Sequence, residues 1–279
     1  MLIIIATVIA VLGFFTAQQI YERTSVYSRL DHDIRILNLE PRGGWSSIKA
    51  SLQPVKFLDR PHYTALSYAW GTKEADHKLW IGQGTVSLRD NLFHALDSMT
   101  VSDTPLSLWV DAVCIDQDNS QEKNLQVPMM AFIYRRVKEV IVWLGVHKLP
   151  STFAKVDLDH LSAELSQARI LEPDKFNSLW EILEPWLYRL IYEEYWKRLW
   201  IIQEICLATQ LYVHFSTGRV SWETFVNLVM LYKNLHITDH RADIIINLAA
   251  TRLDMYRGGE AYSLSALLTT YKNAFCQDL

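Results

Sequence analysis

Hydrophobic and polar residues alternate in several short runs of the first half of the chain, and this period of two predicts β-strands. We expect strands over residues 34–39 and 63–69, and a β-hairpin in which residues 78–81 and 85–88 are joined by a glycine-containing turn. The apolar run over residues 106–115 predicts a central strand that is buried on both faces. The first half of the chain is therefore predicted to form a β-sheet.

Apolar residues recur at helical spacing elsewhere, and this pattern dominates the second half. Together the two patterns predict an α/β fold in which a mostly parallel sheet is flanked by helices. We expect a sheet-rich part over residues 34–149 and a helix-rich part over residues 150–279. The predicted helices cover residues 91–99, 119–138, 158–170, 173–195, 197–208, 241–256 and 264–275, with a further helix starting at Ser221 and further strands over 139–144 and 210–215.

The first 21 residues differ in character from the rest, because residues 2–17 carry no charge. A bilayer span takes about 20 apolar residues, so this run is at the short edge unless residues 18–21 extend it to the interface. Arg23 and Arg29 follow the run, which favours a signal anchor with a cytoplasmic domain behind it. A cleaved signal peptide and a buried terminal helix are the alternatives.

Net charge and cysteine usage exclude several classes of protein. The chain has 27 basic and 31 acidic residues, a formal net charge of −4, without the basic excess typical of nucleic-acid-binding proteins. Cys114, Cys206 and Cys276 lie far apart and form no CxxC pair, which argues against a disulfide framework or a zinc site. We therefore expect no nucleic-acid partner, no resident cofactor and no metal.

Three blocks of sequence follow one another in an order that is specific to one family. They read YTALSYAWG at residues 63–71, LWVDAVCIDQ at residues 108–117 and RLWIIQEI at residues 198–205. Together they resemble the fungal heterokaryon incompatibility (HET) domain, and the resemblance extends over residues 34–279. Members of this family often continue beyond the position of Leu279, so the resemblance implies that this chain is truncated.

A HET domain implies a role in nonself recognition and programmed cell death, through protein partners or self-association. HET domains are similar to TIR domains, flavodoxin-like modules of which some cleave NAD between nicotinamide and ribose with a glutamate. The resemblance therefore implies a TIR-like sheet, with NAD or a related nucleotide as substrate. The alternative is a non-catalytic interaction module that signals by assembly. If residues 1–21 are an anchor, we also expect a membrane contact through them.

Glu122 and Asp111 are the candidate catalytic residues for such a reaction. Cleavage of an N-glycosidic bond builds positive charge on the ribose, and a fixed carboxylate stabilises that charge. Both carboxylates lie at or just after the carboxyl end of the strand predicted over residues 106–115, where open α/β sheets bind ligands. The alternative for Glu122 is a capping box with Asn119. The alternative for Asp111 is a buried structural pairing, for example with Arg198.

Trp70, Gly71, Asp116, Gln117 and Arg198 are candidate ligand contacts. Trp70 could stack on a nucleotide base, Gly71 allows a close turn, and Arg198 could pair with a phosphate. Each of these residues also has a structural interpretation. Trp70 suits a packed core, Asp116 and Gln117 suit a plain turn, and Arg198 suits an ion pair within the protein.

Pro128 falls inside the helix predicted over residues 119–138. A proline there removes one backbone donor and costs about 3 kcal/mol unless the helix kinks or starts later. A helix that starts only near Pro128 leaves Glu122 in an irregular loop. This outcome favours the non-catalytic hypothesis.

Overall fold

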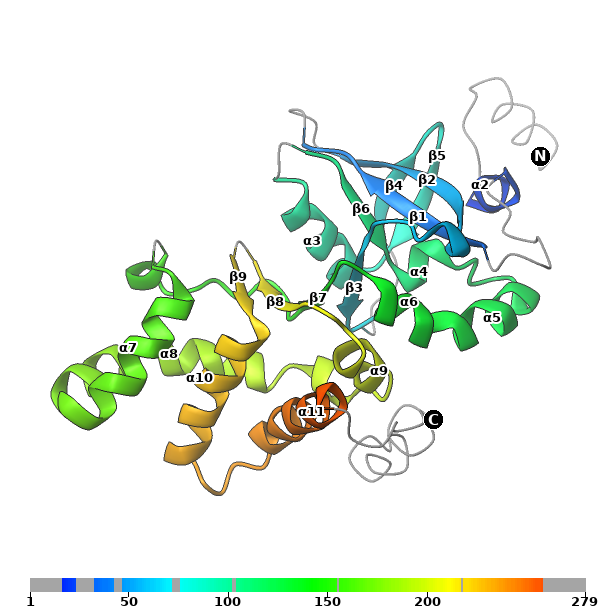
Figure 1. The fold of residues 1–279 in the computed structure, drawn as a ribbon. Coiled ribbons are helices and arrows are strands. Elements are labelled where there is room, and N and C mark those ends of the chain that lie inside the picture. Colours follow the sequence, from blue (N-terminus) through cyan, green and yellow to red (C-terminus); the bar gives the residue numbers. More distant parts are fainter. Residues whose placement is uncertain are drawn as a thin grey trace. The chain divides into compact units, whose positions relative to one another are not determined.

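The structure of the protein is a computed structural model, drawn in Figure 1. The residues that it describes are 17–23, 33–42, 47–71, 76–101, 104–154, 156–216 and 218–257. Their contacts divide the chain into two compact units. The first unit contains the described residues of Met1–Leu66 and Trp70–Lys138, and the second contains Ser67–Ala69 and the described residues of Glu139–Leu279.

The first unit is built on a mixed β-sheet with the strand order β5-β4-β2-β1-β6-β3. Strand β1 is antiparallel to β2 and to β6, whereas β3 is parallel to β6 and β2 is parallel to β4. The strands are β1 (Asp33–Leu39), β2 (Ile48–Lys56), β3 (Thr64–Tyr68), β4 (His77–Ile81), β5 (Gly84–Leu88) and β6 (Leu106–Trp109), and only the first three residues of β3 belong to this unit. Strands β4 and β5 form the predicted hairpin, and Gly82 turns it with a φ of 58°.

Helices of the first unit contribute apolar side chains to its core. Helix α3 buries Leu92, Ala95, Leu96 and Met99, which recur at the spacing of one helical face. The helices are α2 (Ala17–Arg23), α3 (Asp90–Met99), α4 (Asp111–Cys114), α5 (Ser120–Gln126) and α6 (Met130–Arg136), with 3₁₀ turns at Phe57–Asp59 and Val127–Met129.

The strand predicted over residues 106–115 is wrong beyond Trp109. Val110 is still extended, but Asp111 begins the single turn α4, in which the amide of Cys114 donates to the carbonyl of Val110 at 2.7 Å. An apolar run of this length suits a buried strand and a buried helical turn equally, so its pattern could not separate the two.

The helix predicted over residues 119–138 is interrupted at Pro128. The chain forms α5, then a 3₁₀ turn over Val127–Met129, then α6. Pro128 stands in the first positions of this turn, where no intrahelical donor is required, and the turn's hydrogen bond is made by the amide of Met130 to the carbonyl of Val127. Glu122 therefore lies in regular helix, in the first turn of α5, and not in an irregular loop.

The second unit has few strands and long helices. Strand β7 (Glu139–Trp143) is parallel to β8 (Leu211–Phe215), which is antiparallel to β9 (Gly218–Ser221). Its helices are α7 (Leu158–Leu171), α8 (Pro173–Ile191), α9 (Ile201–Cys206), α10 (Trp222–Leu235) and α11 (Arg241–Tyr256), with 3₁₀ turns at Ser151–Phe153 and Glu194–Lys197. The predicted α/β class with a helical C-terminal half is confirmed.

Two of the sequence predictions fall wholly or mainly outside the described residues, namely the helix over residues 264–275 and the apolar run over residues 2–17. Ile20 and Tyr21 of α2 are described, and both are buried, with exposed fractions of 5% and 8%. Their side chains pack on the protein. Within the described residues, none of the helices has the length and apolar character needed to cross a bilayer.

Candidate functional site

The end of β6 places Asp111 at the start of α4, where its carboxylate is held by two donors. Trp70 Nε1 donates to Oδ2 at 2.9 Å, and the amide of Ala112 donates to Oδ1 at 2.7 Å. The side chain is 9% exposed. A carboxylate this close to burial requires such donors, because an unpaired buried charge is very costly. The structure therefore brings together two of the predicted site residues, Trp70 and Asp111.

Trp70 and the glycine after it are held by a single arginine. Gly71 adopts a φ of 73°, in the left-handed region, and its carbonyl accepts from Arg89 Nη1 at 2.8 Å. The Arg89 guanidinium also lies over the Trp70 ring, 5.7 Å from its centroid. We call Trp70, Gly71, Arg89 and Asp111 the Trp70–Asp111 cluster. Sequence reasoning missed Arg89, which stands outside the three blocks.

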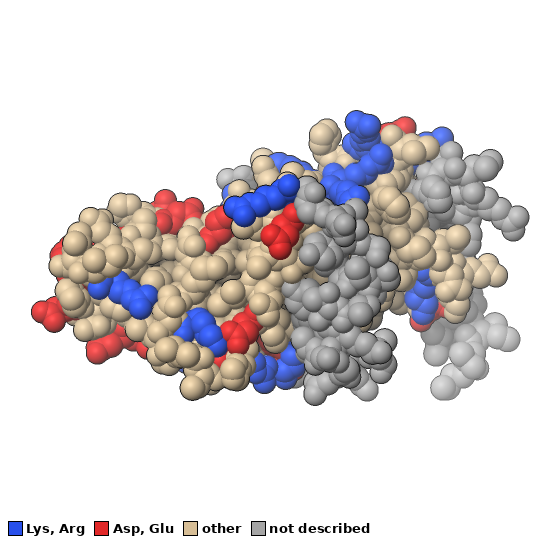
Figure 2. Space-filling view, turned by 60° about the horizontal axis from the view of Figure 1, so that its bottom comes forward, with Lys and Arg blue, Asp and Glu red and all other residues tan. Residues whose placement is uncertain are grey.

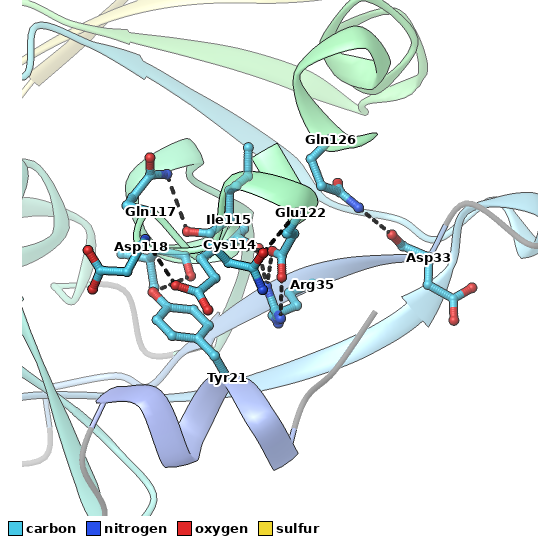
Figure 3. A network of polar contacts seen from close by, with 12 residues as sticks. Tyr21, Asp33, Arg35, Cys114, Ile115, Gln117, Asp118, Glu122 and Gln126 are labelled. Atoms are coloured by element: carbon cyan, nitrogen blue, oxygen red, sulfur yellow. Dashed lines mark hydrogen bonds and ion pairs between the residues drawn. The ribbon is translucent and has the colours of Figure 1, made fainter. Parts of the chain in front are cut away.

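Glu122 has a different set of partners, shown in Figure 3. Its carboxylate forms a bidentate ion pair with Arg35 of β1, in which Arg35 Nη1 donates to Oε1 and Nη2 donates to Oε2 at 3.0 Å. The amide of Asp116 also donates to Oε1 at 2.9 Å. The exposed fractions of the Arg35 and Glu122 side chains are 1% and 2%. Glu122 is therefore enclosed by protein donors.

Arg35 also ties this ion pair to its surroundings. Its Nη1 donates to the carbonyl of Cys114 at 3.1 Å, and its guanidinium lies 5.0 Å from the centroid of the Tyr21 ring. The Tyr21 hydroxyl donates to the carbonyl of Val113 at 3.1 Å. Burial raises the pKa of Tyr21. Helix α2, strand β1 and the turn α4 are thus connected through one polar network (Figure 3).

Asn119 caps α5, as one of the two interpretations of Glu122 requires. Its Oδ1 accepts from the amides of Gln121 and Glu122, both at 3.1 Å. In a full capping box the Glu122 carboxylate would accept from the backbone amide of Asn119. Here it accepts from Arg35 and from the amide of Asp116 instead. The Asn119–Glu122 spacing therefore predicted the start of the helix correctly. The Glu122 carboxylate forms a buried ion pair with Arg35.

Asp116 and Gln117 form the turn between α4 and α5. Asp116 Oδ1 accepts from the amide of Asp118 at 3.1 Å, and Gln117 Nε2 donates to the carbonyl of Asp111 at 2.8 Å. A hollow of about 270 Å³ lies beside this turn. Its lining includes Gln18, Tyr21, Asp116, Asp118 and Asn119. Of these two predicted ligand contacts, Asp116 lines the hollow. The Gln117 side chain instead stabilises the turn through its hydrogen bond to the carbonyl of Asp111.

Arg198 belongs to the second unit, where it takes part in a buried polar cluster. The Ser67 hydroxyl donates to Glu204 Oε2 and lies 2.5 Å from the Tyr195 hydroxyl, and Arg198 Nη1 lies 3.5 Å from the same Oε2. Ser67, Tyr195 and Glu204 are each 1% exposed. Burial, and after it the charge of Glu204, raises the pKa of Tyr195. We call these four residues the Ser67–Glu204 cluster.

Sequence reasoning did not assign Ser67 or Tyr195 to a site. The signal was present, because Ser67 stands within the block over residues 63–71, and Glu204 stands within the block over residues 198–205. Two blocks that are far apart in sequence therefore supply one buried hydrogen-bonded group. Asp111 and Glu122 lie in the first unit and Arg198 in the second.

Comparisons with known proteins agree on the family of this chain. A family model described as heterokaryon incompatibility protein (HET) matches residues 63–204. Over 221 residues the chain is 30% identical to "Heterokaryon incompatibility protein 6, OR allele" of Neurospora crassa. That alignment covers 63% of this chain and 32% of the relative, so the chain spans about a third of the relative's length. No solved structure matches the chain.

Proposed function

Because this chain belongs to the heterokaryon incompatibility (HET) family, we propose that it acts in fungal nonself recognition as a non-catalytic protein-interaction module that signals cell death by assembly. The ion pair between Arg35 and Glu122 is the observation that favours the non-catalytic alternative, because it occupies the carboxylate that a TIR-like reaction would need. The relative's name supplies the context of incompatibility.

Glu122 is poorly placed to stabilise a ribosyl cation. A catalytic carboxylate must face the reacting atoms, within about 3 Å of them. Both oxygens of Glu122 already accept hydrogen bonds from Arg35, one also accepts from the amide of Asp116, and the side chain is 2% exposed. Removing one partner of a buried ion pair costs about 3–5 kcal/mol, because the other charge stays buried and unpaired. These contacts support a structural role for Glu122.

Exposed apolar side chains support a protein partner. Leu125 of α5 and Phe132 of α6 are each 59% exposed, and both flank the 3₁₀ turn at Val127–Met129. In the view of Figure 2, acidic and basic side chains are interspersed over the described surface. This distribution, with a formal net charge of −4, supports a protein partner or a second copy of the chain over a nucleic acid.

A paired assay tests whether the module acts without catalysis. Purified protein is incubated with NAD and nicotinamide release is followed, while the same variants are expressed in a fungal host and scored for cell death. We expect nicotinamide release at the level of a protein-free blank, and cell death that persists in Asp111→Asn. Nicotinamide release that depends on Asp111 or Glu122 would overturn the proposal.

A second variant tests assembly directly. Leu125→Glu with Phe132→Glu should shift the protein toward the monomer in size-exclusion chromatography and should weaken cell death. Surface substitutions at exposed positions usually change stability by no more than about 0.5 kcal/mol, so the double variant should stay folded. Ile170→Glu is the comparison variant: Ile170 is also apolar and 79% exposed, at the end of α7, so an effect confined to the double variant assigns assembly to α5 and α6.

Nucleotide hydrolysis at the Trp70–Asp111 cluster is the second candidate function, and one observation favours it. Asp111 Oδ2 accepts from the half-buried Trp70 indole, so a carboxylate and an aromatic ring are fixed next to each other. In this alternative Asp111, and not Glu122, stabilises the developing charge on the ribose, with NAD or a related nucleotide as substrate. Loss of nicotinamide release in Asp111→Asn, with release retained in Glu122→Gln, is the result that distinguishes it.

A further inference from the structure

The start of β4 and the start of α3 bring together two carboxylates and an imidazole outside the family blocks. His77 Nε2 lies 3.1 Å from Asp90 Oδ1 and 3.4 Å from Asp76 Oδ1. These three residues form the Asp76–His77–Asp90 cluster. One ligand atom from each of the three side chains lies within 4.8 Å of the other two. Among the described residues, no other group of three or more His, Cys, Asp or Glu side chains meets this criterion.

The two separations measured from His77 Nε2 match those between ligands of one metal ion. Zinc lies about 2.0–2.2 Å from nitrogen and oxygen ligands. Two ligands at about 2.1 Å are therefore about 3.0 Å apart at a right angle and about 3.4 Å apart at the tetrahedral angle. Both distances measured from His77 Nε2 fall in this interval. The position of the imidazole relative to each carboxylate is therefore compatible with one shared ion.

Packing holds the His77 imidazole in a defined orientation. Its ring stacks on Phe93 of α3, with 4.0 Å between centroids and 10° between planes. Fixing the ring in this way reduces the ordering that a metal ion must impose on its ligand. The edge of the ring that carries Nε2 faces the two carboxylates.

A second imidazole lies on the same helix. His94 follows Asp90 by four residues, so the two side chains share one face of α3. The ring centroid of His94 lies 6.1 Å from that of His77, and His94 is exposed. His94 is therefore a neighbour of the cluster and not one of its three members.

Although the cysteine spacing gave no reason to expect a metal, we propose that Asp76, His77 and Asp90 form a binding site for a divalent transition metal, with zinc as the best match. Imidazole with carboxylate oxygens suits Zn²⁺, and two carboxylates balance its charge. The exposed fractions of the Asp76, His77 and Asp90 side chains are 71%, 32% and 28%, so the ion enters directly from solvent.

Metal binding at this position would stabilise Trp70 and Gly71, the last residues of the first family block. Arg89 immediately precedes Asp90, and it donates to the carbonyl of Gly71 and covers Trp70. An ion bound to Asp76 and Asp90 links the start of β4 to the start of α3, directly beside Arg89. The site therefore acts as a clamp on the strand and helix next to the Trp70–Asp111 cluster.

Zinc titration of the full chain, freed of metal with a chelator, tests the proposal. We expect one equivalent of Zn²⁺ to bind with a micromolar dissociation constant in calorimetry and to raise the melting temperature. Co²⁺ at the same site should show the visible absorption of a low-symmetry, four- or five-coordinate ion. Mg²⁺, which prefers oxygen ligands, should not compete at equal concentration.

Three variants remove one ligand each. His77→Phe keeps the ring stack on Phe93, Asp90→Asn keeps the shape of the side chain, and Asp76→Asn changes a residue that is 71% exposed. Each should weaken zinc binding at least about tenfold, as even changes outside the ligand set can do. Circular dichroism checks that the variants are folded. If His77→Phe or Asp90→Asn fails to fold, Asp76→Asn still tests the site, because Asp76 is at the surface.

The matched control is another exposed His–Asp pair, in the second unit. His240 Nδ1 lies 3.0 Å from Asp243 Oδ2, and the His240 side chain is 86% exposed. His240→Phe should leave zinc binding unchanged. The proposal fails if the wild-type protein binds no zinc at micromolar concentration, or if binding persists unchanged in Asp76→Asn. In either case the cluster is a hydrogen-bonded group without a metal.

Discussion

Arg35 of β1 and Glu122 of α5 form a buried bidentate ion pair, 87 residues apart in sequence. Their side chains are 1% and 2% exposed, so neither charge can be solvated by water if the other is removed. The pair joins the sheet of the first unit to the helix that follows the second family block.

Replacing Glu122 with alanine should destabilise the protein by about 3–5 kcal/mol, because Arg35 is left buried without its partner. Urea unfolding followed by circular dichroism measures the free energy of unfolding. Glu194→Ala is the control, since Glu194 pairs with Lys197 at the surface and is 72% exposed. That change should cost no more than about 1 kcal/mol. Equal effects of the two substitutions would refute a structural role for the buried pair.

Removing the Tyr195 hydroxyl should weaken the Ser67–Glu204 cluster. Tyr195→Phe takes away a hydroxyl that lies 2.5 Å from Ser67 Oγ, in a site where Ser67 and Glu204 are each 1% exposed. Ser67 keeps Glu204 as its acceptor, so the substitution removes one hydrogen bond, which contributes about 0.5–1.5 kcal/mol. Differential scanning calorimetry should show a lower melting temperature. Tyr188→Phe, at a 44% exposed tyrosine, should leave the melting temperature nearly unchanged.

The indole of Trp70 should stabilise Asp111 measurably. Trp70→Phe keeps an aromatic ring but removes the Nε1 donor at 2.9 Å from Asp111 Oδ2. Hydrogen bonds to charged groups contribute about 1.5–3 kcal/mol, so we expect a loss of that size in chemical denaturation. Trp200→Phe, at a 37% exposed tryptophan, is the control. If Trp70→Phe is no more destabilising than Trp200→Phe, the Trp70–Asp111 hydrogen bond is energetically unimportant.

His214 of β8 should make stability depend on pH. Burial, and after it the positive charge of Arg219, lowers the pKa of His214 from 6.5 to about 4. The folded state therefore favours the neutral imidazole. As the pH falls through this interval, the unfolded state takes up a proton before the folded state does, so stability present above pH 6.5 is lost toward pH 4. The loss should be on the order of 2–3 kcal/mol.

The difference between two unfolding curves isolates this effect from other titrating groups. The free energy of unfolding of His214→Gln, measured from pH 7 to pH 4, should decline less than that of the wild-type protein. His240→Gln serves as control, because His240 is 86% exposed. A wild-type decline that persists in full in His214→Gln would assign the pH dependence to other groups.

Several elements could be predicted because their signals are local. The hairpin β4–β5 follows from alternation on both sides of Gly82, and the start of α10 follows from Ser221, whose hydroxyl accepts from the amide of Thr224 at 3.2 Å. Strand β2 was missed although its residues alternate in burial, since Pro54 and two lysines mask the pattern. The end of β6 was misjudged because Val113, Cys114 and Ile115 are buried in a turn as they would be in a strand.

The sequence by itself determined the family, the α/β class and the residue types available to a site, because ordered blocks and hydrophobic periodicity are written along the chain. Only the tertiary structure decided what those residues do. In the folded protein Glu122 forms an ion pair with Arg35, Asp111 accepts a hydrogen bond from Trp70, and Ser67 donates one to Glu204. These partners are 41 to 137 residues apart, and no periodicity in the sequence encodes which distant donor satisfies a buried carboxylate.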